Sequence, residues 1–147
     1  MYQSVDSSKE SVSTEKVESR FRDFGEAASE FVRLVSAEGG ISYRGEPSAV
    51  KDNLNVMKKV FGKWSIEIIL STYSMKSVGF GDLRRLLQGI SSRVLSKKLK
   101  DLEELGFLER RVVESKPPRV RYTLSKKGEL LAKLGEPVIL YLRNSME

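Results

Sequence analysis

The chain has 147 residues, of which 39% are hydrophobic, and it contains no cysteine and no histidine. That length fits one domain, or one domain with an appendage. The missing residue types exclude disulfides, thiol redox sensing, zinc sites built from Cys or His, and catalytic triads that need either residue. General acid–base catalysis would fall to Asp, Glu, Lys or Tyr, and nothing in the sequence calls for it, so we expect no metal site, no cofactor and no enzymatic activity.

No apolar run approaches the ~20 residues that a membrane-spanning helix needs, and the polar N-terminus shows no signal peptide. We expect a cytoplasmic protein without a membrane partner.

The net charge of +6 is unevenly distributed along the chain. Residues 1–50 carry 6 basic and 9 acidic side chains, a net −3, whereas residues 51–147 carry 20 basic and 11 acidic ones, a net +9. This asymmetry favours a polyanion as the partner of the second part.

The first 50 residues divide into two predicted segments. Residues 1–14 are rich in Ser, Lys and Glu, and we predict that they are disordered. Residues 15–50 are predicted to form a helix and a loop. From about Glu15 to Ala37 the apolar residues recur every three or four positions, at Val17, Phe21, Phe24, Ala28, Phe31 and Val35. Such a heptad-like stripe must be covered. Packing on its own domain and packing across a dimer interface both fit, so this segment is a possible dimerisation extension.

A Gly-Gly pair at residues 39–40 is predicted to end the first helix, and a loop follows it. The main domain is predicted to comprise residues 51–147. Ser48 is the predicted N-cap of a second helix that extends to Phe61. The run from Lys63 to Tyr73 is apolar on nearly all sides, and its β-branched residues could suggest a strand. Its length favours a buried helix, with Glu67 on the exposed side.

Two helices joined by a tight turn are predicted between Phe80 and Leu105, with the turn at residues 88–90. Ser91 is the expected N-cap of the second helix, and Gly106 occupies the position where a left-handed residue ends it. The apolar positions are Phe80, Leu83, Leu86 and Leu87 in the first helix, and Val94, Leu95, Leu99, Leu102 and Leu105 in the second.

The polar face of the second of these helices is basic and rich in hydroxyl groups in its first turns, and acidic at its end. The basic half holds Ser92, Arg93, Ser96, Lys97 and Lys100, and the acidic end holds Asp101, Glu103 and Glu104. A helix-turn-helix that reads DNA needs this layout, because the N-terminal half of its second helix enters the major groove. An ordinary solvated helix face is the alternative. The acids could also suggest the Mg²⁺ site of an enzyme acting on nucleic acid, but a solvated helix end explains them better.

Two strands follow, over residues 107–113 and 120–124, and Pro117-Pro118 ends the first of them. A hairpin with a short basic loop, placed directly after such a helix pair, indicates a winged helix. The predicted wing tip holds Ser115, Lys116 and Arg119. A hairpin whose charged edges only guard against aggregation is the alternative. The fold class is therefore mainly α with a small β-hairpin (α+β): a winged helix-turn-helix with additional N- and C-terminal helices.

A last helix is predicted to begin after a cap at Ser125 and to be kinked or split near Glu136, because Gly135 and Pro137 interrupt it. Its apolar face is longer than is needed to cover a wing, and dimerisation is the simplest use for the remainder. The candidate dimerisation residues are Val17, Phe21, Phe24, Phe31, Leu134, Val138, Tyr141 and Leu142.

Several motifs, in this order along the chain, resemble the HxlR-type winged helix regulators, which are relatives of the MarR group. They are Gly62-Lys63-Trp64, Phe80-Gly81-Asp82-Leu83, Gly89-Ile90-Ser91, Gly106-Phe107-Leu108-Glu109-Arg110, Pro117-Pro118-Arg119-Val120-Arg121-Tyr122 and Leu124-Ser125-Lys126-Lys127-Gly128. The resemblance covers residues 51–143 and implies a homodimeric DNA-binding transcriptional regulator. Many members carry a Cys ahead of the Gly-Lys-Trp motif and some use it as a sensor; residues 51–54 here contain none, so a small-molecule effector is left open.

By position, the resemblance places the recognition helix at residues 91–100 and the wing at residues 115–121. The predicted base-reading residues are Ser92, Arg93, Ser96 and Lys97. The predicted phosphate or wing contacts are Ser91, Lys98, Lys100, Ser115, Lys116, Arg119 and Arg121. The expected partners are double-stranded DNA and a second copy of the chain. The alternative function is a protein-interaction adaptor, since fold alone does not give function.

Overall fold

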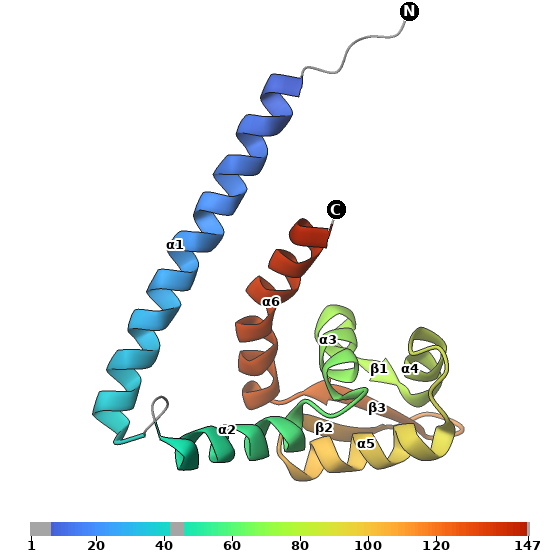
Figure 1. The fold of residues 1–147 in the computed structure, drawn as a ribbon. Helices are drawn as coiled ribbons and strands as arrows, with labels where there is room; N and C mark the ends of the chain where they lie inside the picture. The colour runs from blue at the N-terminus through green and yellow to red at the C-terminus, as the bar shows by residue number, and fades with distance from the viewer. Residues whose placement is uncertain (1–6, 42–45, 147) are drawn as a thin grey trace, which may run out of the picture. The chain divides into compact units, whose positions relative to one another are not determined.

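Helix α1 (Ser7–Gly39) forms most of the first of two compact units, which comprise residues 1–53 and 54–147 (Figure 1). The computed structural model describes residues 7–41 and 46–146. The helix begins earlier than predicted, because residues 7–14 belong to it; residues 1–6 of the predicted disordered segment lie outside the described residues. As predicted, α1 ends at the Gly-Gly pair, where Gly40 has a φ of +61°.

Helix α2 (Pro47–Val60) contains the boundary between the two units. It begins at Pro47, one residue before the predicted cap at Ser48. Proline suits the first helical position, because its φ is already helical and its missing N–H would have no partner there. Residues 42–45 of the predicted loop lie outside the described residues.

The apolar run that could have been a strand is helix α3 (Ser65–Met75). Ile68 and Ile69 are 0% and 2% exposed, whereas Glu67 is exposed as predicted. The Thr72 hydroxyl is also buried, and it donates a hydrogen bond of 2.8 Å to the Ile68 carbonyl one turn earlier. Helix α3 is therefore the central helix of the second unit, and its buried hydroxyl at Thr72 is satisfied inside the helix itself.

The predicted pair of helices is present as α4 (Phe80–Leu86) and α5 (Ser92–Glu104). The Ser91 side chain caps α5 as expected, since its Oγ accepts the Val94 N–H at 3.2 Å. Gly89 and Gly106 have φ of +90° and +80°, conformations that disfavour a residue with a Cβ. One glycine closes the turn between the helices and the other ends α5.

The predicted hairpin consists of β2 (Leu108–Val113) and β3 (Arg119–Leu124). It belongs to a three-stranded antiparallel sheet of order β1-β3-β2, because the short link before α4 forms the edge strand β1 (Val78–Gly79). Val78 pairs with Tyr122 and Gly79 with Arg121. Two residues are too few to show a strand period, so the sequence alone does not indicate this strand.

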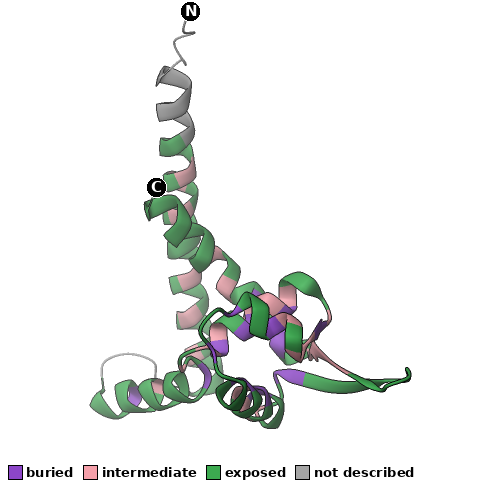
Figure 2. Ribbon diagram, turned by 90° about the vertical axis from the view of Figure 1, so that its right-hand side faces the viewer, coloured by how far each residue is buried: buried purple, intermediate pink, exposed green. Residues whose placement is uncertain are grey.

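The core of the second unit lies between the helices and one face of this sheet (Figure 2). Its most buried apolar side chains, all at most 2% exposed, are Ile68, Ile69, Val78, Leu83, Leu95, Leu99, Leu102, Leu108 and Ala132. Figure 2 shows the hairpin extending away from this core as an exposed ribbon. The fold is thus a winged helix-turn-helix, as the pattern of elements predicted.

Helix α6 (Lys126–Met146) begins at the predicted cap, where the Ser125 Oγ accepts the Gly128 N–H at 3.0 Å. The sequence predicted a kink or a split near Glu136, and the split does not occur, because the helix passes through Pro137 without a break. A proline inside a helix removes one hydrogen bond but need not end it, and Figure 1 shows α6 bending part-way along its length. Among the described residues, no helix is both long and apolar enough to cross a membrane.

Candidate nucleic-acid interface

Helix α5 has one buried face and one exposed face. Leu95, Leu99 and Leu102 are at most 2% exposed and attach the helix to the core. The predicted base-reading residues Ser92, Arg93, Ser96 and Lys97 are all exposed on its other side. The second unit thus presents a rigid helix whose N-terminal half carries hydroxyl and cationic groups.

The exposed cations of α5 differ in their partners within the protein. Lys97 Nζ lies 2.8 and 3.2 Å from the two carboxylate oxygens of Asp101, one turn later. Lys100 lies 3.7 Å from Glu104. These i,i+4 pairs are solvent-exposed and weak, so they can be exchanged for phosphate contacts, but they partly neutralise both lysines.

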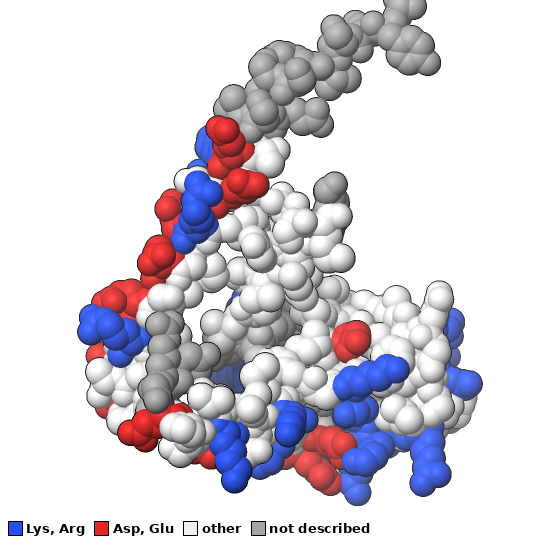
Figure 3. All heavy atoms as spheres, viewed as in Figure 1, with Lys and Arg blue, Asp and Glu red and all other residues white. Residues whose placement is uncertain are grey.

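Figure 3 shows how charge is distributed on one face of the molecule. Basic side chains gather at the end of the second unit where α5 begins, and acidic side chains lie farther along that helix. Lys98 is half-buried, in contrast to Arg93 and Lys97, which are exposed. A phosphate contact fits Lys98 better than a base contact, because a half-buried lysine can keep its stem along the protein while its ammonium reaches a phosphate.

The wing carries its predicted polar residues at its tip. Ser115, Lys116 and Arg119 are exposed, and the Ser115 hydroxyl donates a 2.6 Å hydrogen bond to the Pro117 carbonyl. Val112 is 59% exposed on the same hairpin. The tip is therefore a closed turn that presents two cations, and the exposed Val112 lies on the strand that leads to it.

Arg121 differs from the other predicted wing contacts. Its Nη2 donates to the Ser77 carbonyl at 2.7 Å, and its Nε donates to the Ser77 hydroxyl at 3.1 Å. Its Nη1 lies 3.3 Å from the Asp82 carboxylate. All three guanidinium nitrogens thus have partners within the protein. The predicted DNA contact by Arg121 stays a prediction, and this network competes with it.

Two features of the interface were not predicted from the sequence. Arg84 is exposed on α4, the helix that crosses the DNA backbone in a helix-turn-helix, and the adjacent basic pair Arg84-Arg85 could have signalled it. The link between Arg121 and Asp82 joins residues 39 positions apart, and no local pattern in the sequence indicates it.

The candidate dimerisation residues lie on two helices. On α6, Leu134, Val138, Tyr141 and Leu142 are 46–63% exposed. On α1, Phe24 and Phe31 are 52% and 62% exposed, whereas Val17 and Phe21 are half-buried. Both helices therefore carry large apolar side chains that the chain itself does not fully cover.

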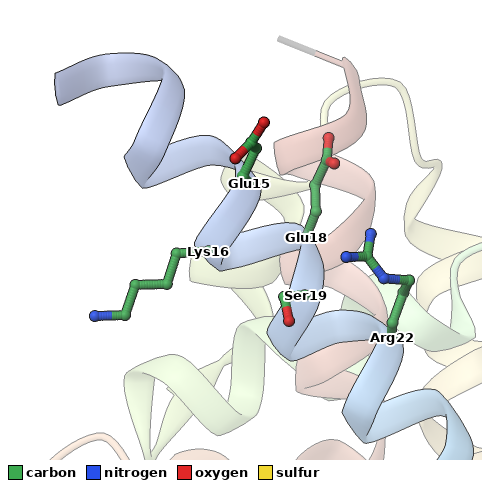
Figure 4. Close-up of a pocket in the computed structure, with 5 residues that line it drawn as sticks. All are labelled: Glu15, Lys16, Glu18, Ser19 and Arg22. Atoms are coloured by element: carbon green, nitrogen blue, oxygen red, sulfur yellow. The ribbon is translucent and has the colours of Figure 1, made fainter. Parts of the chain in front are cut away.

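Hollows elsewhere on the described surface include one in the second unit, lined in part by Thr72, Tyr73 and Lys76, and one on α1. Figure 4 shows a shallow hollow lined by Glu15, Lys16, Glu18, Ser19 and Arg22 of α1. These side chains project from the helix in different directions and do not converge. Within residues 7–41 and 46–146, no group of three or more acidic side chains could hold a metal ion.

Comparison with known proteins agrees with this geometry. An uncharacterised HTH-type transcriptional regulator of Methanothermobacter thermautotrophicus is 28% identical over 103 residues, which is 67% of this chain and 78% of that protein. The uncharacterised HTH-type transcriptional regulator YtfH of Escherichia coli is 38% identical over 74 residues, 50% of this chain. That match spans 58% of YtfH, less than two thirds of its length.

A solved structure shares the fold over nearly its whole length. It is ytfH of Salmonella typhimurium, described as a candidate transcriptional regulator, with 30% identity and a TM-score of 0.51. The similarity covers 68% of this chain and 98% of that one. The resemblance noted from the sequence motifs is confirmed by a family model that matches residues 59–144, more than half of the chain. This protein belongs to the HxlR-like helix-turn-helix family.

Proposed function

We propose that the chain is a transcriptional regulator that binds double-stranded DNA as a homodimer, with α5 in the major groove. The observation that carries the proposal is the two-sided character of α5. Its leucines fix it to the core, so Ser92, Arg93, Ser96 and Lys97 face outward from a rigid element. A guanidinium can bind both acceptors of guanine, and hydroxyl groups adapt to several bases.

The wing supplies the second contact of the proposed complex. Lys116 and Arg119 at its exposed tip can lie on phosphates or enter the minor groove, where Arg is favoured. Arg84 on α4, together with Lys98 and Lys100 on α5, adds phosphate contacts. These cations position the protein on the duplex, whereas the base contacts give the sequence preference.

The proposed dimer uses α6. Leu130, Leu134, Val138 and Tyr141 recur every three or four residues and are 51–63% exposed. A continuous apolar stripe of this kind is covered by a partner in a stable protein, and a second copy covers it symmetrically. The stripe on α1, with Phe24 and Phe31, belongs to the proposed dimerisation extension, which comprises residues 15–50.

The proposed location is the cytoplasm, where the DNA of a prokaryote lies.

A gel shift with random genomic fragments at two salt concentrations tests the function. A DNA-binding regulator forms complexes whose affinity falls steeply between about 50 and 200 mM salt, because bound cations displace counterions from phosphate. A protein-interaction adaptor would give no shift at either concentration. The exposed cations on both α5 and the wing favour the first result, since an adaptor has no need of both.

A further inference from the structure

Arg121 connects three segments that are far apart in the sequence. It lies on β3, its bonds to Ser77 reach the segment before β1, and its bond to Asp82 reaches the first turn of α4. The side chains of Arg121 and Asp82 are only 36% and 29% exposed. A planar guanidinium with several directed donors holds such a geometry, which a flexible ammonium group does not.

Asp82 joins the same network from the side of α4. Its Oδ2 accepts the Gly79 N–H at 3.0 Å, and its other oxygen pairs with Arg85. Gly79 lies directly opposite Arg121 in the β1–β3 register. A Cβ at Gly79 would lie 3.2 Å from Asp82 Oδ2 and 3.5 Å from Arg121 Nη1, so the missing side chain leaves room for the pair.

The neighbouring strand β2 carries an arginine that can be compared with Arg121. Arg111 on β2 lies directly opposite Arg121, and it pairs with Glu109 on its own strand at 2.6 Å. Two like charges at paired positions repel, and each arginine is neutralised by a different acid. Arg111 is exposed and pairs with Glu109 of its own strand, whereas Arg121 connects β3 to another part of the fold.

The position of this network gives it a mechanical consequence. Helix α4 leads into α5 through a short turn, and Leu83 of α4 is completely buried. The network therefore connects the wing to the element that carries the base-reading helix. When two elements must bind one duplex together, fixing their relative position avoids the entropy cost of ordering them on binding.

We propose that Arg121 is a positioning residue that holds the wing against the helix-turn-helix through Ser77 and Asp82, and that it does not contact phosphate. This proposal rests on the proposed DNA-binding function. It differs from the assignment that the chain position of Arg121 suggests, because it places the role of the side chain inside the protein.

The test measures DNA affinity as a function of salt for Arg121→Gln, Arg121→Lys, Asp82→Asn and the control Arg111→Gln. Wild-type binding is measured first, so that failure of the proposed function is recognised separately. We expect Arg121→Gln to weaken binding by about tenfold while the slope of log affinity against log salt is unchanged, since no phosphate contact is lost. Arg121→Lys and Asp82→Asn should weaken binding similarly, and combining Arg121→Gln with Asp82→Asn should weaken it no further. The expected change for Arg111→Gln is less than about threefold.

A phosphate contact by Arg121 predicts different results. Arg121→Gln would then reduce the slope by about 0.9, and Arg121→Lys would bind nearly as wild type, because it keeps the charge. Asp82→Asn would leave affinity unchanged or raise it, because it frees the guanidinium. Any of these outcomes overturns the proposal. Thermal unfolding of each variant shows what fraction of the protein is folded. If Arg121 is a positioning residue, a hydroxyl-radical footprint of its variant should show weaker protection under the wing alone.

Discussion

Lys97 and Asp101 form an ion pair on the exposed face of α5, with Lys97 Nζ at 2.8 and 3.2 Å from the two carboxylate oxygens. The partner of a proposed base-reading residue is thus an acid on the same helix. DNA binding must either break this ion pair or engage Lys97 while it stays paired with Asp101. The acid also places a negative charge beside the proposed phosphate contacts.

Replacing Asp101 by Asn should therefore strengthen DNA binding. We expect a gain of roughly twofold or more, and a helix stability lower by about 0.3–0.5 kcal/mol, because an exposed i,i+4 pair is lost. Fluorescence anisotropy with a cognate and a random duplex measures the effect. Glu104→Gln is the control, since the Lys100–Glu104 pair is longer, at 3.7 Å. Weaker binding by Asp101→Asn would show that the pair orients Lys97 for its contact.

Arg93→Ala should reduce sequence preference. Arg93 is exposed in the first turn of α5, and we expect a loss of ~1–3 kcal/mol at a cognate site with a much smaller loss on random DNA. Lys98→Ala is the matched variant on the half-buried side. It should weaken cognate and random DNA alike and lower the salt slope by about one. Equal losses on both duplexes for Arg93→Ala would contradict its role.

Gly128→Ala should destabilise the packing of α6 against the base of the β2–β3 hairpin. A Cβ at this position would lie 2.1 Å from the Phe107 carbonyl oxygen and 3.2 Å from Leu124 Cδ2, so the backbone must shift. We expect a loss of ~1–3 kcal/mol in the free energy of unfolding, measured by denaturant titration. Gly135→Ala lies on the same helix with nothing within 4 Å of its Cβ. Gly135→Ala should stabilise the protein by up to about 1 kcal/mol, and a loss of stability would contradict a helical environment at this position.

Leu134→Glu should disrupt the proposed dimer. Leu134 is 63% exposed in the centre of the α6 stripe, and a charge there faces its own copy across a two-fold axis. Sedimentation equilibrium should show a shift from dimer to monomer, with weaker cognate binding. Glu136→Ala, on the opposite side of the helix, should leave the dimer intact. A wild-type chain that is monomeric at concentrations where it binds DNA would exclude this interface.

The Asp82 carboxylate should make stability depend on acid pH. The Gly79 N–H, together with the neighbouring Arg85 and Arg121, holds the pKa of Asp82 below its ordinary value. A carboxyl with a lowered folded-state pKa stabilises the fold above its unfolded-state pKa, and the contribution is lost as the pH falls through the folded-state pKa. The stability difference between wild type and Asp82→Asn should be constant above about pH 5 and shrink below about pH 4. A difference that is independent of pH would exclude the linkage.

The local elements were predictable because their signals are local. Ser91 and Ser125 cap helices, and Gly106 takes the left-handed conformation that its position after α5 indicated. The buried and exposed faces of α5 follow from leucine spacing alone. Each of these features depends on residues within about one helical turn of each other.

The relationships that the sequence did not predict are long-range. Val78 and Gly79 join the sheet only because β3 lies beside them, and two residues carry no period. Arg121 was grouped with the wing by its position, whereas its direction depends on Ser77 and Asp82. Pro137 is a local signal that left two outcomes open, a kink or a split, and α6 continues through it because a helix can lose one backbone bond without ending.

The central claim is that α5 reads DNA in a two-fold assembly. It is tested most directly by selecting duplexes from a random-sequence library with the full chain and footprinting the enriched sequence with hydroxyl radicals. We predict enrichment of an inverted repeat with two protected half-sites whose centres are about 10 base pairs, or a multiple of one helical turn, apart. Failure to enrich any sequence, or uniform protection that ignores sequence, would contradict it.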